Sequence, residues 1–435
     1  MKFSRYNVFA QNGDALFILN TLHGNFAKVI IDVDKIYSAL MGDREIPQCH
    51  IGFMKKNYFV VDDDVDEFEE CIKFSRSMVE GGNILNLIIL PTEKCNFSCV
   101  YCYECHNGES LKEHDIDLIV EFAKKHLKGK RGLNVSWFGG EPLIKVSMIR
   151  KLSLKLLELC YSYKISYTAD MTTNGYLLDS ALVNELKKLH IYSYQVTIDG
   201  LCNTHDRQRY LTSGKGTWNK IIENLKDIKE NCHSGVMRFV IRTNISREIY
   251  AEYKEFVNFL SSNFSRDSRF HFLFRPVSDW GNIDESVKDT FITQSEYEEI
   301  ILYALNKELF NVALQIAITP GGNLCYAWKK NCYVIRANGN VGKCTVLIDD
   351  EVNQIGHISG KISNDKFWVY NLKNKPSKCI ECPKYPICLK VKCKMPDSIK
   401  CDNFVSNMEK YLPMIADERY GCILYGGEEK CETKS

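Results

Sequence analysis

The 19 cysteines of this 435-residue chain are the residues most able to do chemistry, and most of them are grouped. Four lie within eleven residues: Cys95, Cys99, Cys102 and Cys105. Two further groups follow: Cys325, Cys332 and Cys344, then Cys379, Cys382, Cys388, Cys393 and Cys401. Clustered thiolates are ligands of iron–sulfur clusters and of zinc, so the grouping predicts metal centres. The cysteines outside these groups are expected to be mostly small buried side chains.

The spacing Cys95-x3-Cys99-x2-Cys102 favours an iron–sulfur cluster at the first group. Three thiolates from one loop can hold three irons of a [4Fe–4S] cluster and leave the fourth iron open for chemistry. A structural zinc ion instead takes a closed set of four protein ligands. Cys105 could supply that fourth ligand, so zinc remains the alternative at this site.

Composition excludes several other functions. The 56 Lys and Arg residues face 55 Asp and Glu, a formal charge of +1, whereas binding along nucleic-acid phosphates needs a basic excess. No apolar run approaches the roughly 20 residues of a membrane helix, and Met1–Gly13 has no apolar segment of a secretion signal. We therefore expect a cytoplasmic protein with reduced thiols, and neither nucleic acid nor membrane as a partner.

A regular alternation of strands and helices between residues 84 and 276 predicts the scaffold behind the first cysteine group. The β-rich apolar runs are Ile84–Leu90, Leu133–Phe138, Ile165–Met171, Tyr192–Ile198, Val236–Ile241 and Phe270–Phe274. Stretches with helical periodicity separate them, near 112–128, 147–162, 179–189, 217–231 and 249–262. Repeated β–α alternation gives a parallel α/β sheet, and six strands make a partial (β/α)6 TIM barrel rather than a closed one.

Polar and glycine-rich segments follow the first four predicted strands. The cysteine triplet follows the first strand and Gly139-Gly140-Glu141 the second. Thr172–Gly175, which includes Asn174, ends the third strand, and Thr197–Gly200 ends the fourth. Because the carboxyl ends of parallel strands meet at one rim, these segments are expected to line a single site.

Residues 1–82 form a separate module in this interpretation. The runs Ala15–Leu19 and Phe26–Ile31 predict a hairpin, with Phe26–Ile31 as the expected edge strand. Helices are expected at Asp34–Met41 and Asp64–Glu80, and a shorter second hairpin at Gly52–Val61. This order of elements suggests a winged-helix-like unit.

The predicted domains are therefore 1–82, 83–314 and 315–435, the last being the cysteine-rich region. Asn338-Gly339 within it predicts a type I′ hairpin turn that would place Cys344 on the returning strand.

The segment Cys95–Tyr103, CNFSCVYCY, resembles the signature loop of the radical S-adenosylmethionine (SAM) superfamily, with the aromatic Tyr101 before the third cysteine. Gly139-Gly140-Glu141 resembles that superfamily's GGE motif, which binds the methionine amino group. By the same resemblance, Thr197 and Arg209 match positions that contact the cofactor, and Asn174 lies on the same rim. The resemblance implies a [4Fe–4S] cluster that binds SAM and cleaves it to a 5′-deoxyadenosyl radical, which removes a hydrogen atom from a substrate.

The later cysteines resemble the SPASM extension of peptide-modifying radical enzymes, which carries two auxiliary [4Fe–4S] clusters. That pattern implies one cluster on Cys325, Cys332, Cys344 and Cys393, and another on Cys379, Cys382, Cys388 and Cys401. The family usually has three residues before the fourth cysteine of the last run, whereas Leu389 to Lys392 make four here. Two zinc sites remain the alternative, since spacing alone does not separate thiolate-bound metals.

Residues 1–82 are similar to the leader-peptide recognition elements of maturases of ribosomally made peptides, which bind a peptide by strand addition. An inert N-terminal cap is the alternative. Together the resemblances imply a radical SAM peptide maturase and oxidoreductase that forms a thioether or C–C cross-link in a precursor peptide. Its electrons would come from a reductant such as flavodoxin or ferredoxin.

Two other functions stay open at this stage. One is a relative of the anaerobic sulfatase-maturing enzymes, which make formylglycine. In that group an Asp base follows the cysteine that matches Cys344, where this chain has Thr345. The other is a non-enzymatic iron–sulfur electron carrier. The sequence identifies no catalytic acid or base.

Overall fold

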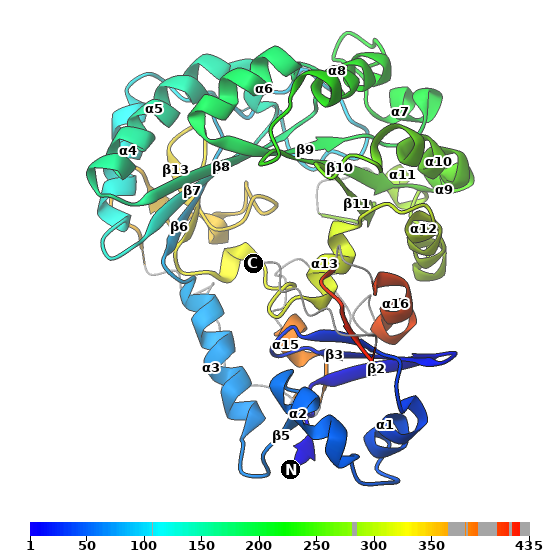
Figure 1. The fold of residues 1–435 in the computed structure, drawn as a ribbon. Coiled ribbons are helices and arrows are strands. Elements are labelled where there is room, and N and C mark those ends of the chain that lie inside the picture. Colours follow the sequence, from blue (N-terminus) through cyan, green and yellow to red (C-terminus); the bar gives the residue numbers. More distant parts are fainter. Residues whose placement is uncertain are drawn as a thin grey trace. The chain divides into compact units, whose positions relative to one another are not determined.

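A computed structural model describes residues 1–106, 108–280, 285–363, 379, 382–389, 407–416 and 420–426. The chain divides into two compact units, which are treated separately below (Figure 1). The first consists of Met1–Met78, Val312–Cys325 and Tyr370–Ser435, and the second of Val79–Asn311 and Tyr326–Val369. Among the described residues, no helix is both long and apolar enough to span a bilayer.

Six parallel strands form the centre of the second unit, where the sequence predicted them. They are β6 (Ile84–Ile89), β7 (Gly132–Trp137), β8 (Ser166–Thr173), β9 (Ile191–Thr197), β10 (Arg238–Ile245) and β11 (Phe270–Pro276). Each strand pairs in parallel with the next in the chain. The predicted α/β class with a central, mostly parallel sheet is confirmed.

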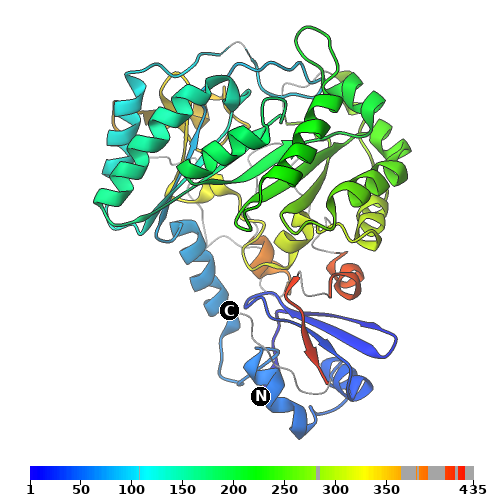
Figure 2. The same cartoon turned by 45° about the horizontal axis from the view of Figure 1, so that its top comes forward.

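Amphipathic helices cover the outer face of this curved sheet (Figures 1 and 2). They are α4 (Asp115–His126), α5 (Val146–Ser162), α6 (Ser180–Leu186), α8 (Trp218–Asn231) and α10 (Tyr253–Phe264). Shorter helices and α12 complete the unit: η1 (Pro142–Lys145), η2 (Lys187–Leu189), α7 (Cys202–Gln208), α9 (Arg247–Ala251), α11 (Glu285–Lys288), α12 (Gln294–Asn306), η3 (Tyr326–Trp328) and η4 (Glu351–Asn353). Alternate residues of each strand are buried, as a period of two requires; in β10 these include Phe239 and Ile241.

Three strands from the predicted third domain extend this sheet. Strand β12 (Cys332–Ile335) pairs in parallel with β6, and β13 (Asn340–Gly342) and β14 (Gly356–His357) follow in antiparallel order. Residues 326–369 therefore belong to the second unit, and the division differs from the three consecutive segments that the sequence suggested. The physical reason is strand pairing between segments far apart in the chain.

The hairpin at Asn338-Gly339 is present, but the predicted type I′ turn is wrong. Only Gly339 has a positive φ, 84°, whereas a type I′ turn needs positive φ at both central residues. Cys344 lies two residues beyond β13 rather than on it.

The first unit contains a small sheet followed by helices. Strands β2 (Asn7–Asn12), β3 (Ala15–Asn20) and β4 (Phe26–Val29) pair in antiparallel order, and β1 (Lys2–Phe3) pairs with β5 (Val60–Val61). The helices are α1 (Val33–Leu40), α2 (Gln48–Lys56), α3 (Glu67–Glu80, whose last residues enter the second unit), α13 (Val312–Ile318), α15 (Tyr385–Cys388) and α16 (Met408–Ile415). The predicted first hairpin and the helices α1 and α3 are confirmed.

Two local predictions for this unit are wrong. The second hairpin expected at Gly52–Val61 is not formed: residues 52–56 belong to α2, and Val60–Val61 form β5, which pairs with β1. His50 and Met54, four residues apart, are both buried on one face of α2. Strand β4 is not an edge strand, since β15 (Ile423–Tyr425) pairs with it in parallel and gives the order β15-β4-β3-β2.

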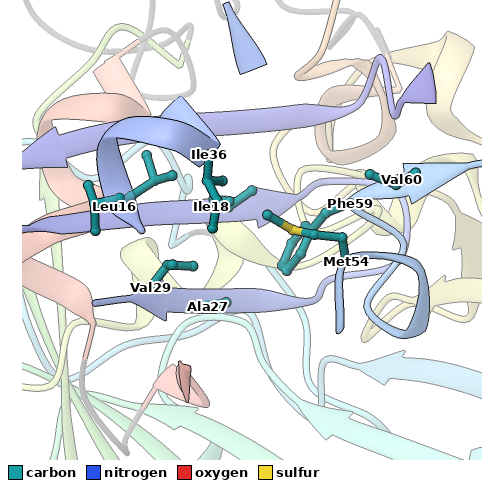
Figure 3. Packing of buried hydrophobic residues seen from close by; sticks show 9 residues of the cluster. Leu16, Ile18, Ala27, Val29, Ile36, Met54, Phe59 and Val60 are labelled. Atoms are coloured by element: carbon teal, nitrogen blue, oxygen red, sulfur yellow. The ribbon is translucent and has the colours of Figure 1, made fainter. Parts of the chain in front are cut away.

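The core of the first unit lies between the hairpin and the helices (Figure 3). Leu16 and Ile18 of β3 and Val29 of β4 point toward Ile36 of α1 and Met54 of α2. All five side chains are fully buried. This packing holds the sheet and both helices together as one cooperative element.

Replacing Ile18 by Ala should destabilise the first unit by about 3 kcal/mol, because the substitution leaves a cavity in a close-packed core. Ile30→Ala is the matched control, since Ile30 is 40% exposed and its loss leaves no cavity. Hydrogen exchange of the β3 and β4 amides in both variants measures the difference. Equal protection in the two variants would contradict this account of the core.

Candidate active site

The loop that carries the first cysteine group rests against a glycine pair at the end of β7. Gly139 and Gly140 have φ angles of 82° and 45°. A Cβ on Gly140 would lie 2.2 Å from the carbonyl oxygen of Lys94. The backbone N–H of Glu141 donates to that same carbonyl at 3.0 Å. Only residues without a Cβ allow this approach, so the glycine pair sets the position of the chain just before Cys95.

A bidentate ion pair holds the same loop from the other side. Nε and Nη2 of Arg336, which follows β12, donate to the two carboxylate oxygens of Glu93, each at 2.9 Å. Arg336 also donates to Asp349 at 2.9 Å. The side chains of Arg336 and Glu93 are both largely buried, and their bidentate contact has a defined geometry.

A cavity opens where the six parallel strands end, and Cys95, Cys99 and Cys102 line it together. Other lining residues follow each strand: Phe138, Gly139 and Gly140; Thr172, Thr173 and Asn174; Gln195 and Thr197; Arg242 and Asn244; Pro276, Val277 and Ser278. Tyr101 and Arg209 line it as well, so the rim expected from the sequence is assembled in the fold.

Glu141 is the one predicted cofactor contact that lies behind the rim. Its carboxylate is fully buried and accepts from Leu143 N at 3.0 Å, Thr173 Oγ1 at 2.8 Å and Asn174 N at 2.7 Å. Burial raises the pKa of this carboxyl, and the three donors oppose the rise. The side chain therefore ties the end of β7 to the end of β8 instead of facing the cavity.

A polar network lies at the cavity wall, and its charged members Asp199 and Arg209 are buried. The hydroxyl of Tyr101 donates to Asp199, and Nη1 of Arg209 donates to that hydroxyl at 2.8 Å. Asn244 donates from its backbone to Asp199 at 2.6 Å and from its side chain to Tyr101 at 3.2 Å. Burial raises the pKa of the Asp199 carboxyl, while the nearby guanidinium of Arg209 lowers it. The network fixes Arg209 at the cavity wall.

Arg209 keeps one donor free in this arrangement. Its Nε is buried and has no hydrogen-bond partner among the described residues. The guanidinium carbon lies 5.5 Å from the centre of the Phe97 ring. An unpaired buried N–H is unfavourable, so this donor is suited to an anionic ligand group such as a carboxylate.

The three thiols need a metal to ionise. Burial raises the pKa of the Cys95 and Cys102 thiols to about 12, and it raises the pKa of Cys99 as well. Bound metal replaces such protons, so this donor set fits a metal site better than a free nucleophile. The N–H of Phe97 donates to Cys95 Sγ at 3.4 Å. Cys105, the fourth ligand in the zinc alternative, is exposed and does not line the cavity.

Two cysteines of the second group are buried in the second unit. Cys332 begins β12, and the Sγ of Cys344 accepts from the backbone of Val346 at 3.3 Å and of Leu347 at 3.5 Å. Asn353 closes this turn by accepting from the N–H of Cys344 at 2.9 Å. Cys325 belongs to the first unit.

The third group is partly described. Cys379 and Cys382 pack in one cluster of the first unit with Tyr6, Cys71 and Tyr385. Cys388 ends α15. Cys393 and Cys401 lie outside the described residues, so their predicted ligand roles rest on the sequence.

Sequence reasoning missed three polar residues of the site. The carboxylate of Glu104 accepts from Gly140 N at 2.9 Å, and burial raises its pKa. Arg242 and Asn244 both line the cavity from β10. For the two strand residues a signal was available, since Arg242 and Asn244 lie two positions apart near the carboxyl end of β10 and so share one face.

His205 and Asp206, which are adjacent in the sequence close to Arg209, have structural roles. Asp206 accepts from the backbone of Thr217 at 2.7 Å and of Trp218 at 2.9 Å, where α8 begins. His205 is fully buried and lies 3.1 Å from the Thr217 hydroxyl. Both residues stabilise the start of the helix.

Residues 89–260 match the family model of the Radical SAM superfamily. This stretch contains the three cavity cysteines, the glycine pair and the Tyr101–Asp199–Arg209 network, and it is a radical SAM domain. The superfamily implies a [4Fe–4S] cluster and SAM, and both fit the three thiols and the free Arg209 donor described above.

Individual proteins with similar sequences include two enzymes. The cysteine-type anaerobic sulfatase-maturating enzyme of Clostridium novyi is 25% identical over 372 residues, 75% of this chain and 95% of that protein. The radical SAM cyclopropyl synthase TigE of Paramaledivibacter caminithermalis is 23% identical over 263 residues, 52% of this chain and 54% of that protein. The solved structure of native anSMEcpe with bound AdoMet and Cp18Cys peptide has the same fold, with a TM-score of 0.61 and 17% identity over 78% of this chain and 98% of that one.

Gly140→Ala should displace the cysteine loop and reduce the iron bound at the first group. Gly129→Ala is the matched control, because Gly129 also has positive φ, 74°, but nothing lies within 4 Å of its Cβ position. The control should lose roughly 1–2 kcal/mol of stability from backbone strain alone and keep its iron. Iron analysis and thermal unfolding of both variants measure this. Equal iron in the two variants would contradict the steric argument.

Proposed function

We propose that this protein is a radical SAM peptide maturase that oxidatively cross-links a precursor peptide through a thioether or C–C bond. The observation that carries the proposal is the convergence of three partly buried thiols, a glycine backbone and the unpaired Nε of Arg209 on one cavity. When bound, the cluster and SAM supply the one-electron chemistry that removes a hydrogen atom from a substrate carbon.

The chain's own residues would hold and orient the cofactor. Arg209 and Thr197 are suited to its carboxylate, since both line the cavity and Arg209 is fixed by Tyr101 and Asp199. Gly139 and Gly140 allow backbone groups to approach a ligand closely. Holding these groups in place before the ligand binds reduces the reorganisation that the reaction requires.

We also propose two auxiliary [4Fe–4S] clusters, on Cys325, Cys332, Cys344 and Cys393, and on Cys379, Cys382, Cys388 and Cys401. The two backbone donors to the Cys344 sulfur support this, because such hydrogen bonds tune the potential of thiolate-bound clusters. A flavodoxin or ferredoxin is the proposed reductant.

The N-terminal sheet and helices are the proposed recognition element for the precursor's leader. Support comes from the antiparallel strands β2 to β4 followed by α1 to α3, a layout suited to adding a peptide strand. Met1–Met78 do not form a compact unit by themselves. The same compact unit includes Val312–Cys325 and Tyr370–Ser435.

Formylglycine formation is the second candidate, favoured by the similarity to the Clostridium novyi enzyme. The residue after Cys344 counts against it. Thr345 is buried and its hydroxyl lies 2.7 Å from the hydroxyl of Tyr326, so no carboxylate base occupies this position. A non-enzymatic electron carrier is disfavoured, because it needs neither the glycine pair nor an unpaired hydrogen-bond donor for an anionic ligand.

Changing Cys95, Cys99 and Cys102 together to Ala should remove about a third of the iron, since one of three proposed cubes is lost. Reductive cleavage of SAM should disappear with it. Cys105→Ala is the matched control and should keep both, because its thiol is exposed. Cleavage that survives in the triple variant would place the catalytic cluster elsewhere.

Mass spectrometry of two peptides separates the substrate classes. The precursor encoded beside the gene should lose one hydrogen from each of the two atoms joined. A cysteine-bearing sulfatase peptide should give no formylglycine, because Thr345 cannot act as the base. Aldehyde formation that keeps pace with SAM cleavage would overturn the cross-linking proposal in favour of the second candidate.

A further inference from the structure

The C-terminal strand β15 occupies the sheet edge that a leader peptide would need. Its residues Ile423, Leu424 and Tyr425 pair in parallel with Ala27, Lys28 and Val29 of β4. The N–H of Ile30 donates to the carbonyl of Tyr425 at 3.0 Å. Figure 2 shows this red strand along the blue N-terminal sheet.

One side chain anchors this strand. The ring of Tyr425 stacks on Phe53 of α2, with centroids 3.6 Å apart and planes 11° from parallel. Its hydroxyl lies 3.1 Å from Nδ1 of His50, which is buried and holds Asp32 through Nε2 at 2.9 Å. Phe53 thus contacts the apolar face of the tyrosine ring and His50 its polar end, and these two residues are called the Phe53–His50 site below.

The residue after the anchor is restricted as well. Gly426 has a φ of 106°, and a Cβ there would lie 2.5 Å from a methyl group of Ile31. The edge therefore favours an extended segment in which glycine follows the aromatic residue.

The other two side chains of β15 contribute little to its binding. Leu424 is 58% exposed and Ile423 is 39% exposed, so backbone pairing holds them and their side chains contribute little. A strand of three residues with one anchor is a small contact, which a longer peptide pairing along the same edge can replace.

We propose that the β4 edge and the Phe53–His50 site together bind an extended peptide segment that carries an aromatic residue followed by glycine, and that the chain's own β15 is an internal competitor for this site. The inference rests on the proposed peptide function and adds its regulation. A tethered segment competes at a high effective concentration, so precursor binds only to the fraction of molecules whose edge is open.

The test uses a fluorescein-labelled synthetic peptide with the sequence of residues 420–429, in which serine replaces Cys422. Its affinity is measured by anisotropy for the full-length chain, Tyr425→Ala and the matched control Leu424→Ala. Tyr425→Ala should bind the peptide at least about tenfold more tightly than the unchanged chain, because the competing anchor is gone. Leu424→Ala should bind like the unchanged chain.

A second variant tests the Phe53–His50 site itself. Adding Phe53→Ala to Tyr425→Ala should abolish the gained affinity, with thermal unfolding confirming that the protein is folded. Equal affinity of the unchanged chain and Tyr425→Ala, or no binding to folded Tyr425→Ala, would overturn the proposal. The assay needs no cluster or SAM. A preparation that shows the binding pattern but never cleaves SAM would therefore refute the proposed function and leave the binding site standing.

Discussion

The contact between Gly140 and the carbonyl of Lys94 is the constraint on which the cavity depends. Strand β6 delivers the cysteine loop, and β7 ends in the glycine pair that receives it. No side chain fits between the backbones of Gly140 and Lys94. The contact therefore fixes the position of the chain just before the three cysteines. The Glu93–Arg336 pair, supplied by the strand on the other side of β6, restrains the same loop. A metal site whose ligands come from one loop needs such external support, since short loops do not hold their own geometry.

Two buried carboxylates near this cavity, those of Glu141 and Asp199, have different structural roles. Glu141 and Asp199 are both fully buried, and burial raises the pKa of each. Each accepts several hydrogen bonds, which makes burial tolerable. Glu141 joins two strand ends, whereas Asp199 orients Tyr101 and Arg209 toward the cavity. The protein thus uses polar networks to set positions around the cavity, while Nε of Arg209, a cavity-lining residue, is buried without a hydrogen-bond partner among the described residues.

The first unit is built from distant parts of the chain. Its sheet combines β2 to β4 with β15, and a second cluster packs Tyr6 and Cys71 with Cys379 and Tyr385. Stability of this unit therefore depends on residues near both ends of the sequence. The same arrangement stacks the C-terminal residue Tyr425 on Phe53 of α2, beside strand β4.

Local patterns in the sequence were sufficient for the six parallel strands, their helices and the rim that gathers the cysteines, because a period of two or 3.6 residues reflects burial of one face. Cysteine spacing likewise singled out the loop whose three thiols line the cavity. Helix α2 was missed because its two buried positions, His50 and Met54, give a weak periodic signal.

Only the folded chain determined several other features. They are the pairing of β12 with β6 and of β15 with β4, the buried position of the Glu141 carboxylate, and the unpaired Nε of Arg209. These features depend on contacts between residues tens to hundreds of positions apart, which no local periodicity records.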